Sequence, residues 1–77
     1  MRIEVLGDGC ANCKQLEAHV RAALAASGLS AHLEVSADPA RLAGYGVLRL
    51  PGLVVDGRLV ASGTVLSVAQ VQALLAG

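Results

Sequence analysis

Apolar and polar residues alternate in two short stretches near the start of the chain, residues 2–6 and 31–35. A period of two residues predicts β-strands, each with one face in the core. In the first strand, Ile3 and Val5 are expected to face the core and Glu4 to face away from it. In the second strand, the expected inward residues are Ala31, Leu33 and Val35, and the expected outward residues are His32 and Glu34.

Between these strands the period lengthens to three and four residues, which predicts an amphipathic helix from about Ala11 to Ala26. Ser27-Gly28 is expected to end this helix, because glycine readily adopts the left-handed conformation that follows a helix. A strand, a helix and a strand joined in this way are expected to form a right-handed parallel unit. The apolar stripe of the helix consists of Leu16, Val20, Ala23 and Leu24.

The second half of the chain predicts a short helix, a β-hairpin and a closing helix. Asp38-Pro39 matches an N-cap followed by proline, so a short helix is expected from Pro39 to about Ala43. Asp56-Gly57 lies between two apolar runs and indicates a two-residue hairpin turn, with Pro51 at the entrance of the first strand. Ser67 to Gln70 matches a capping box, which predicts the start of the last helix.

Composition narrows the possible functions. A length of 77 residues predicts a single domain, residues 1–77. Apolar residues make up 55% of the chain and Tyr45 is its single aromatic residue, so the core must be aliphatic. Six basic and six acidic residues balance, which excludes the basic, aromatic surface typical of nucleic-acid binding. No apolar run reaches the roughly 20 residues that span a bilayer and no signal pattern opens the chain, so we expect a cytoplasmic protein, not inserted in a membrane, with nothing preceding the fold.

Both cysteines lie within Gly7–Lys14, between the first strand and the first helix. At about 100° per residue, Cys13 falls on the apolar stripe with Leu16, whereas Cys10 lies before or within the first turn. One thiol is therefore expected to be exposed and the other to face the core. This asymmetry suits a nucleophile and a resolving partner. Two thiols also suit a soft metal such as Cu(I) or Zn(II), or a metalloid, and this alternative stays open.

The order of elements, with C-x-x-C at the first strand-to-helix turn and proline before the hairpin, resembles a thioredoxin fold reduced to its core. The motifs resemble those of the small thioredoxin-like redox-active disulfide proteins of prokaryotes, over essentially the whole chain. The resemblance implies an α/β fold of the minimal thioredoxin type, β-α-β-α-β-β-α. Its four-stranded mixed sheet would have the first and third strands in the middle, with three helices. The motifs are Gly7-x-Gly9-Cys10-x-x-Cys13, Tyr45-Gly46-Val47 and Leu50-Pro51-x-Leu53-Val54-Val55-Asp56-Gly57.

The resemblance implies a thiol–disulfide oxidoreductase-like protein in which Cys10 is the nucleophile and Cys13 the resolving cysteine. It also implies a cis peptide bond before Pro51 and a position of this proline beside the sulfurs. The expected partners are a protein or low-molecular-weight disulfide and an unidentified reductase, with no cofactor and no metal site. A non-catalytic redox-responsive adaptor is a further alternative. The expected substrate-binding residues are Leu50, Pro51, Gly9 and Arg49.

Several residues depart from the family's pattern. Leu50 stands before the proline where Thr or Ser is usual, and Gly9 stands before the first cysteine where many thioredoxins have an aromatic residue. No acidic residue is evident as the buried acid beneath the cysteines. His19 and His32 are expected to be solvated surface residues, and Tyr45 is expected to cap the core near the short helix.

Overall fold

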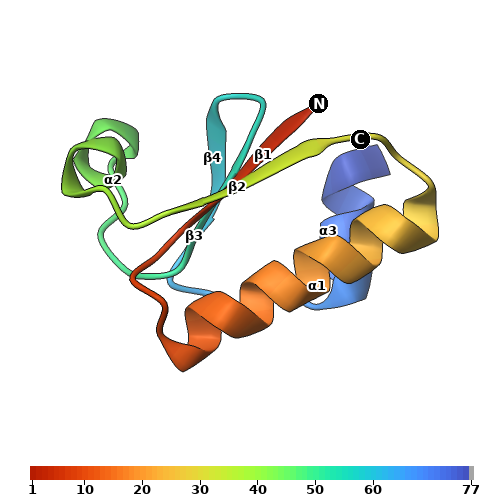
Figure 1. Cartoon of the computed structure of the whole chain (residues 1–77), viewed down its shortest axis with the longest axis horizontal. Coiled ribbons are helices and arrows are strands. Elements are labelled where there is room, and N and C mark those ends of the chain that lie inside the picture. Colours follow the sequence, from red (N-terminus) through yellow and green to blue (C-terminus); the bar gives the residue numbers. More distant parts are fainter. Residues whose placement is uncertain (77) are drawn as a thin grey trace.

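The structure, a computed structural model, describes residues 1–76; Gly77, the last residue of the predicted single domain, lies outside the described residues. Within these residues, four strands and three helices follow one another in the predicted order (Figure 1). The α/β class and the minimal thioredoxin-like arrangement are therefore confirmed. The elements are β1 (Arg2–Leu6), α1 (Ala11–Ser27), β2 (His32–Ser36), α2 (Pro39–Tyr45), β3 (Gly52–Val55), β4 (Arg58–Ser62) and α3 (Val68–Ala76).

The four strands form one mixed sheet in the order β2-β1-β3-β4, as the family resemblance implied. β1 is parallel to β2 and antiparallel to β3, and β3 and β4 form the predicted hairpin around Asp56-Gly57. Leu6 at the end of β1 pairs with Gly52 at the start of β3, which in turn pairs with Ser62 at the end of β4. The segments that leave β1, enter β3 and leave β4 therefore meet at one end of the sheet.

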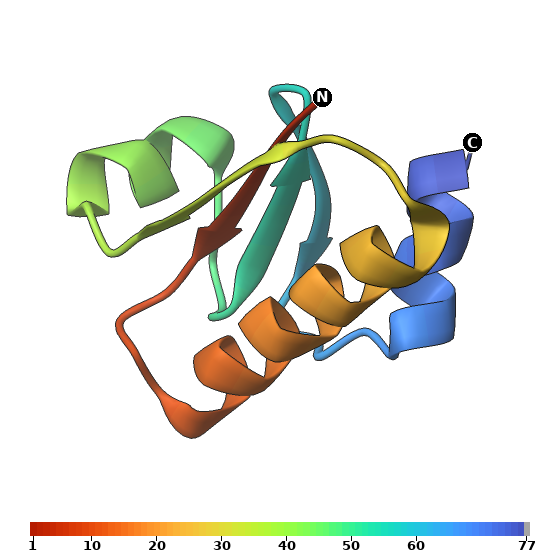
Figure 2. The same ribbon diagram turned by 45° about the vertical axis from the view of Figure 1, so that its right-hand side comes forward.

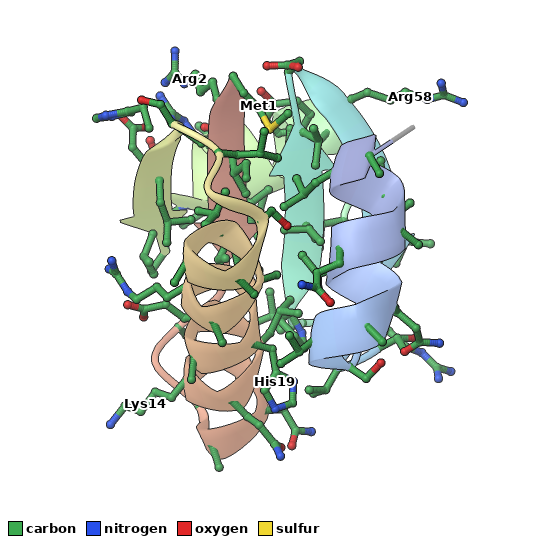
Figure 3. All side chains as sticks on the ribbon, turned by 90° about the vertical axis from the view of Figure 1, so that its right-hand side faces the viewer. Met1, Arg2, Lys14, His19 and Arg58 are labelled. Carbon is green, nitrogen blue, oxygen red and sulfur yellow. A yellow bond between two sulfur atoms is a disulfide. The ribbon has the colours of Figure 1, made fainter. Side chains whose placement is uncertain are left out.

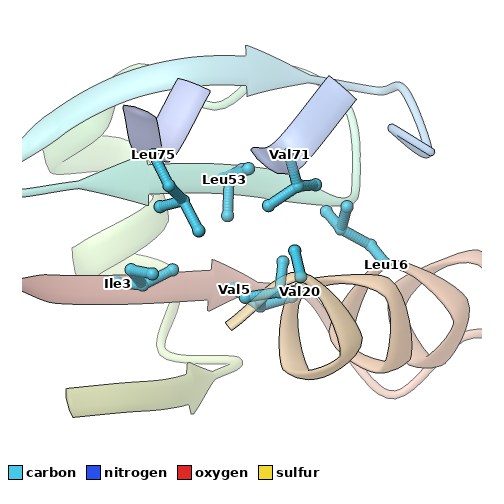
Figure 4. Packing of buried hydrophobic residues seen from close by; sticks show 8 residues of the cluster. Ile3, Val5, Leu16, Val20, Leu53, Val71 and Leu75 are labelled. Atoms are coloured by element: carbon cyan, nitrogen blue, oxygen red, sulfur yellow. The ribbon is translucent and has the colours of Figure 1, made fainter. Parts of the chain in front are cut away.

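Helices α1 and α3 lie side by side against one face of the sheet, whereas α2 lies on the other side (Figures 1 and 2). Between the sheet and α1 and α3, side chains from β1, β3 and both helices point into one aliphatic core (Figure 4). This packing fixes α1, and with it the segment that carries the cysteines, relative to the sheet. The core cluster consists of Ile3, Val5, Leu16, Val20, Ala23, Leu53, Val71 and Leu75.

Two helices begin at the caps that the sequence predicted. At the start of α2, Oδ1 of Asp38 accepts a hydrogen bond of 3.0 Å from the backbone N–H of Ala40. Before α3, Oγ of Ser67 accepts from the N–H of Gln70 at 3.1 Å, and Oε1 of Gln70 accepts from the N–H of Ser67 at 2.9 Å. The capping box is therefore confirmed. None of the helices in residues 1–76 is long and apolar enough to cross a membrane.

The outward orientation predicted for Glu4 was correct, whereas the core position predicted for Val35 was wrong. Glu4 does face away from α1, but it is only 2% exposed because α2 covers this face of β1. Val35, expected in the core, is 48% exposed. It pairs with the fully buried Val5, but β2 is the edge strand and α1 covers its neighbour β1 instead. In both cases the presence or absence of a covering helix decided whether the side chain is buried. The alternation of residues along the strand did not decide it.

Candidate active site

The segment between β1 and α1 depends on two glycines. The N–H of Gly7 donates a 2.9 Å hydrogen bond to the carbonyl of Ser36, which continues the contact between β1 and β2. A Cβ on Gly7 would lie 2.9 Å from Cβ of Cys13 and would also collide with its sulfur. Gly9 has φ of 83°, a conformation that side chains with a Cβ rarely adopt. The backbone can therefore pass this close to Cys13, and then turn into α1, only with glycine at these positions.

The two cysteines form a disulfide at the start of α1, with their Cα atoms 5.1 Å apart. Cys10 is the N-cap residue, and its Sγ accepts a 3.2 Å hydrogen bond from the backbone N–H of Cys13. Cys10 is half-buried, whereas Cys13 is 3% exposed and belongs to the core-facing side of α1. The predicted asymmetry between the two sulfurs is therefore confirmed.

The charged groups around the pair have opposite effects on a negative charge at Cys10. The first turn of α1 contains no acidic residue, and its N–H groups present the positive end of the helix to Cys10. Lys14 is exposed and its side chain projects away from α1 (Figure 3). Asp8 brings a negative charge, and its Oδ1 accepts a 3.2 Å hydrogen bond from the N–H of Cys10. The helix end favours a thiolate at Cys10 in the reduced protein, and the carboxylate of Asp8 opposes it.

The predicted substrate residues Leu50 and Pro51 lie just before β3. Because Leu6 pairs with Gly52, Pro51 and Gly7 are the next residues beyond this pair on adjacent strands. The Leu50–Pro51 peptide bond is cis. Pro51 is buried, and its carbonyl accepts a 2.8 Å hydrogen bond from the N–H of Gly63. The register thus places this proline at the end of the sheet from which the cysteine segment starts.

Arg49 lies at the same end of the sheet but toward β4. Its backbone carbonyl accepts a 3.0 Å hydrogen bond from Oγ of Ser62. Its side-chain stem covers Gly63, where an added Cβ would lie 2.8 Å from Cβ of Arg49. In the same loop, Leu48 projects into solvent with 93% of its surface exposed. The loop therefore presents one apolar and one basic side chain, the stem of the latter being packed.

Sequence reasoning missed a buried carboxylate. Oε2 of Glu4 accepts a 2.8 Å hydrogen bond from the hydroxyl of Tyr45, and Oε1 accepts one of 2.5 Å from Nη1 of Arg41. The hydrogen bond to Glu4, then burial and the charge of Glu4, raise the pKa of Tyr45. The available signal was the spacing of Arg41 and Tyr45, which places both on one face of α2. This acid lies on the face of β1 covered by α2, opposite to α1.

The two histidines have different environments. His32 is exposed, as predicted, and its Nε2 lies 3.2 Å from Oε1 of Glu34. The prediction for His19 was wrong, because this residue is half-buried and its Nδ1 lies 2.8 Å from the carbonyl oxygen of Leu66. Figure 3 shows His19 on α1, near the start of α3. His19 therefore links α1 to the loop before α3, a contact between residues distant in sequence.

The β2-β1-β3-β4 sheet, with a disulfide-forming C-x-x-C pair at the start of α1, defines a thioredoxin-like protein. The family model described as "Thioredoxin domain" matches residues 1–76, and the chain belongs to this family. A curated protein named "Thioredoxin" from Methanothermobacter thermautotrophicus is 37% identical over 75 residues, which cover 97% of each chain. Together with the disulfide between Cys10 and Cys13, this relationship supports a thiol–disulfide redox role.

Proposed function

We propose that the protein exchanges disulfides with a protein or low-molecular-weight partner, with Cys10 as the nucleophile and Cys13 as the resolving cysteine. The observation that carries this proposal is the unequal exposure of the two sulfurs. Cys10 stands half-buried at the N-cap of α1, whereas Cys13 is 3% exposed beneath it. A partner can reach the first sulfur more easily than the second.

The exchange proceeds in two displacements. In the reduced protein, the Cys10 thiolate attacks one sulfur of the partner's disulfide, and the other partner sulfur leaves as a thiolate that takes up a proton. The thiol of Cys13 then loses its proton and attacks Sγ of Cys10, which releases the second partner thiol. The partner's disulfide gains two electrons and becomes a dithiol, and the Cys10–Cys13 pair becomes a disulfide. A dithiol reductant or an unidentified reductase restores the reduced protein.

The substrate surface proposed for this exchange surrounds Cys10. Gly9 precedes it without a side chain, and Leu50 and Pro51 lie at the same end of the sheet. Arg49 supplies a positive charge that attracts anionic partners such as glutathione-like disulfides. In this proposal residues 1–77 act as one domain, without a bound cofactor, in the cytoplasm. The reducing conditions there suit a catalytic C-x-x-C pair better than a structural disulfide.

Serine substitutions separate the two roles. Cys10→Ser is expected to abolish reduction of a small aromatic disulfide, because the attacking sulfur is lost. Cys13→Ser is expected to accumulate a mixed disulfide between Cys10 and the partner, visible as a mass increase in non-reducing mass spectrometry. Ala18→Ser, at an exposed position on the same helix, is the matched control and should exchange at the parent rate.

The reverse pattern would contradict the assignment. If Cys10→Ser trapped the mixed disulfide and Cys13→Ser did not, the roles would be exchanged. If neither the parent nor its variants turned over any disulfide, while circular dichroism showed all of them folded, the exchange function itself would fail.

A further inference from the structure

Three potential metal ligands converge at the start of α1. A carboxylate oxygen of Asp8 and the sulfurs of Cys10 and Cys13 all lie within 4.8 Å of one another. Asp8 is exposed, Cys10 is half-buried and Cys13 is buried, so the group reaches from solvent to the core. The exchange mechanism uses the two sulfurs but gives the carboxylate no task. Its negative charge opposes formation of the thiolate that exchange requires. The exchange mechanism therefore does not explain why an acidic residue lies beside the two sulfurs.

Local hydrogen bonds already orient these three groups. Oδ1 of Asp8 accepts from the N–H of Cys10 at 3.2 Å, and Sγ of Cys10 accepts from the N–H of Cys13 at 3.2 Å. Each contact leaves the acceptor able to bind another partner, because a carboxylate offers about four lone-pair positions and a thiolate keeps its remaining lone pairs. In metal sites the ligating side chains, carboxylates among them, are commonly oriented by hydrogen bonds from surrounding groups.

We propose that the reduced protein binds a divalent ion of the zinc class, such as Zn(II) or Cd(II), through Cys10, Cys13 and Asp8. Two thiolates exclude hard ions such as Mg(II) and Ca(II). The carboxylate oxygen favours Zn(II) over Cu(I), which prefers soft ligands only. A tetrahedral ion would have its fourth position open toward solvent, available to a water molecule or an external thiol.

Metal binding and disulfide formation exclude each other, because both use the same sulfur electrons. The disulfide first takes up two electrons from an added dithiol or phosphine reductant, which becomes a disulfide or a phosphine oxide. The two protons come from the dithiol itself or, with the phosphine, from water. The two thiols then release their two protons as the ion binds. An ion bound in this way withdraws the pair from exchange until it leaves. The inference does not rest on the exchange activity, since it needs only the reduced thiols and the carboxylate.

The test is a competition for Zn(II) between the phosphine-reduced protein and a chromophoric chelator. The parent is expected to retain about one ion per chain, as a single mononuclear site would. Asp8→Asn is expected to weaken zinc binding at least about 10- to 100-fold, because loss of a direct ligand should cost no less than loss of a group that only supports a ligand. Cys10→Ser and Cys13→Ser are each expected to lose the ion. Co(II) in place of Zn(II) should give the visible absorption of a tetrahedral thiolate site.

Asp38→Asn is the matched control. Asp38 also accepts a hydrogen bond through Oδ1 from the N–H two residues on, at Ala40, but no cysteine accompanies it. Asparagine keeps this acceptor in both variants, so the fold is retained and only Asp8→Asn loses a ligand. The inference is overturned if Asp8→Asn holds zinc as tightly as the parent, or if the parent yields all its zinc to the chelator.

Measurements of exchange in the presence of EDTA distinguish this inference from the proposed function. Zinc retention without exchange overturns the proposed function alone, and exchange without zinc retention overturns the inference alone. Added zinc is expected to slow exchange by the parent more than by Asp8→Asn. Equal slowing of the two proteins would count against Asp8 as a ligand.

Discussion

The hydroxyl of Tyr45 donates a 2.8 Å hydrogen bond to Oε2 of Glu4, and this contact joins α2 to a central strand of the sheet. Arg41 reaches the other oxygen of the same carboxylate. None of the residues of α2 is itself buried, so polar contacts, more than apolar packing, hold this helix on the sheet. The chain then runs from α2 through residues 46–51 to Pro51. The carboxylate of Glu4 therefore helps to hold the helix from which this segment starts.

Replacing this carboxylate is expected to destabilise the fold. Glu4→Gln keeps the shape of the side chain but removes the charge that Arg41 and Tyr45 contact, and the free energy of unfolding should fall by about 1–3 kcal/mol. Tyr45→Phe should lower it in the same direction. Urea unfolding followed by circular dichroism measures both changes. Glu17→Gln, which removes an exposed pair with Arg21 on α1, is the control and should change stability by less than about 1 kcal/mol. A Glu4→Gln variant as stable as the parent would contradict the role assigned to this contact.

A methyl group on Gly7 is expected to disturb the cysteine pair. Its Cβ would lie 2.9 Å from Cβ of Cys13, so Gly7→Ala should destabilise the oxidised protein by about 1–3 kcal/mol through overpacking. Gly44→Ala is the matched control, because Gly44 lies in α2 with open space around it. That change should raise stability slightly, since alanine favours the helix by roughly 0.5–1 kcal/mol. Equal effects of the two substitutions on thermal unfolding would refute the close approach at Gly7.

Glu34 is expected to make stability depend on pH in the acid range. Hydrogen bonds from His32 and then Arg2 are the main causes that lower the pKa of Glu34 from its ordinary 4.5 to about 2. Since the folded state favours the ionised form, this contribution is fully present above about pH 4.5 and disappears as the pH falls toward 2. As the pH falls from about 4.5 to 2, Glu34→Gln should therefore lose less free energy of unfolding than the parent. Urea unfolding at several pH values measures this difference. In Glu17→Gln the free energy of unfolding should depend on pH as it does in the parent. The same pH dependence in Glu34→Gln would argue against the contribution predicted for Glu34.

The capping box before α3 is expected to contribute to stability on its own. Ser67→Ala removes the oxygen that accepts from the N–H of Gln70, and the free energy of unfolding should fall by about 0.5–2 kcal/mol. Ser30→Ala, at an exposed loop position, serves as the control. Denaturant midpoints compare the two variants directly. A midpoint for Ser67→Ala that matches the one for Ser30→Ala would mean that the cap is not needed to start the helix.

The local parts of the fold could be predicted because their causes are local. The stripe from Leu16 to Val20 follows from helical periodicity, and the cap formed by Ser67 and Gln70 joins residues within one turn. The placement of Cys10 and Cys13 at the start of α1, with unequal exposure, also followed from their position on that stripe. Each of these features is set by interactions over a few residues, which a pattern of side chains records.

Features that depend on partners distant in the chain could not be predicted in this way. The period of the first strand placed Glu4 on its outward face, but only the position of α2 made it buried and bonded to Tyr45. His19 looked equally exposed until the loop before α3 brought the carbonyl of Leu66 to its ring. A strand's period tells which side chains share a face, but another element has to cover that face before they are buried.

The sequence by itself determined the order of the elements, the helix caps and the position of the two thiols on α1, because each rests on neighbours along the chain. The resemblance to the family implied that β1 and β3 are neighbours and that Pro51 lies beside the sulfurs. Only the tertiary structure decided the register, in which the pairing of Leu6 with Gly52 places Pro51 next to Gly7. It likewise decided that Asp8 lies within reach of both sulfurs. These relationships depend on strand register and on the path of a loop, which are fixed by packing across the whole chain.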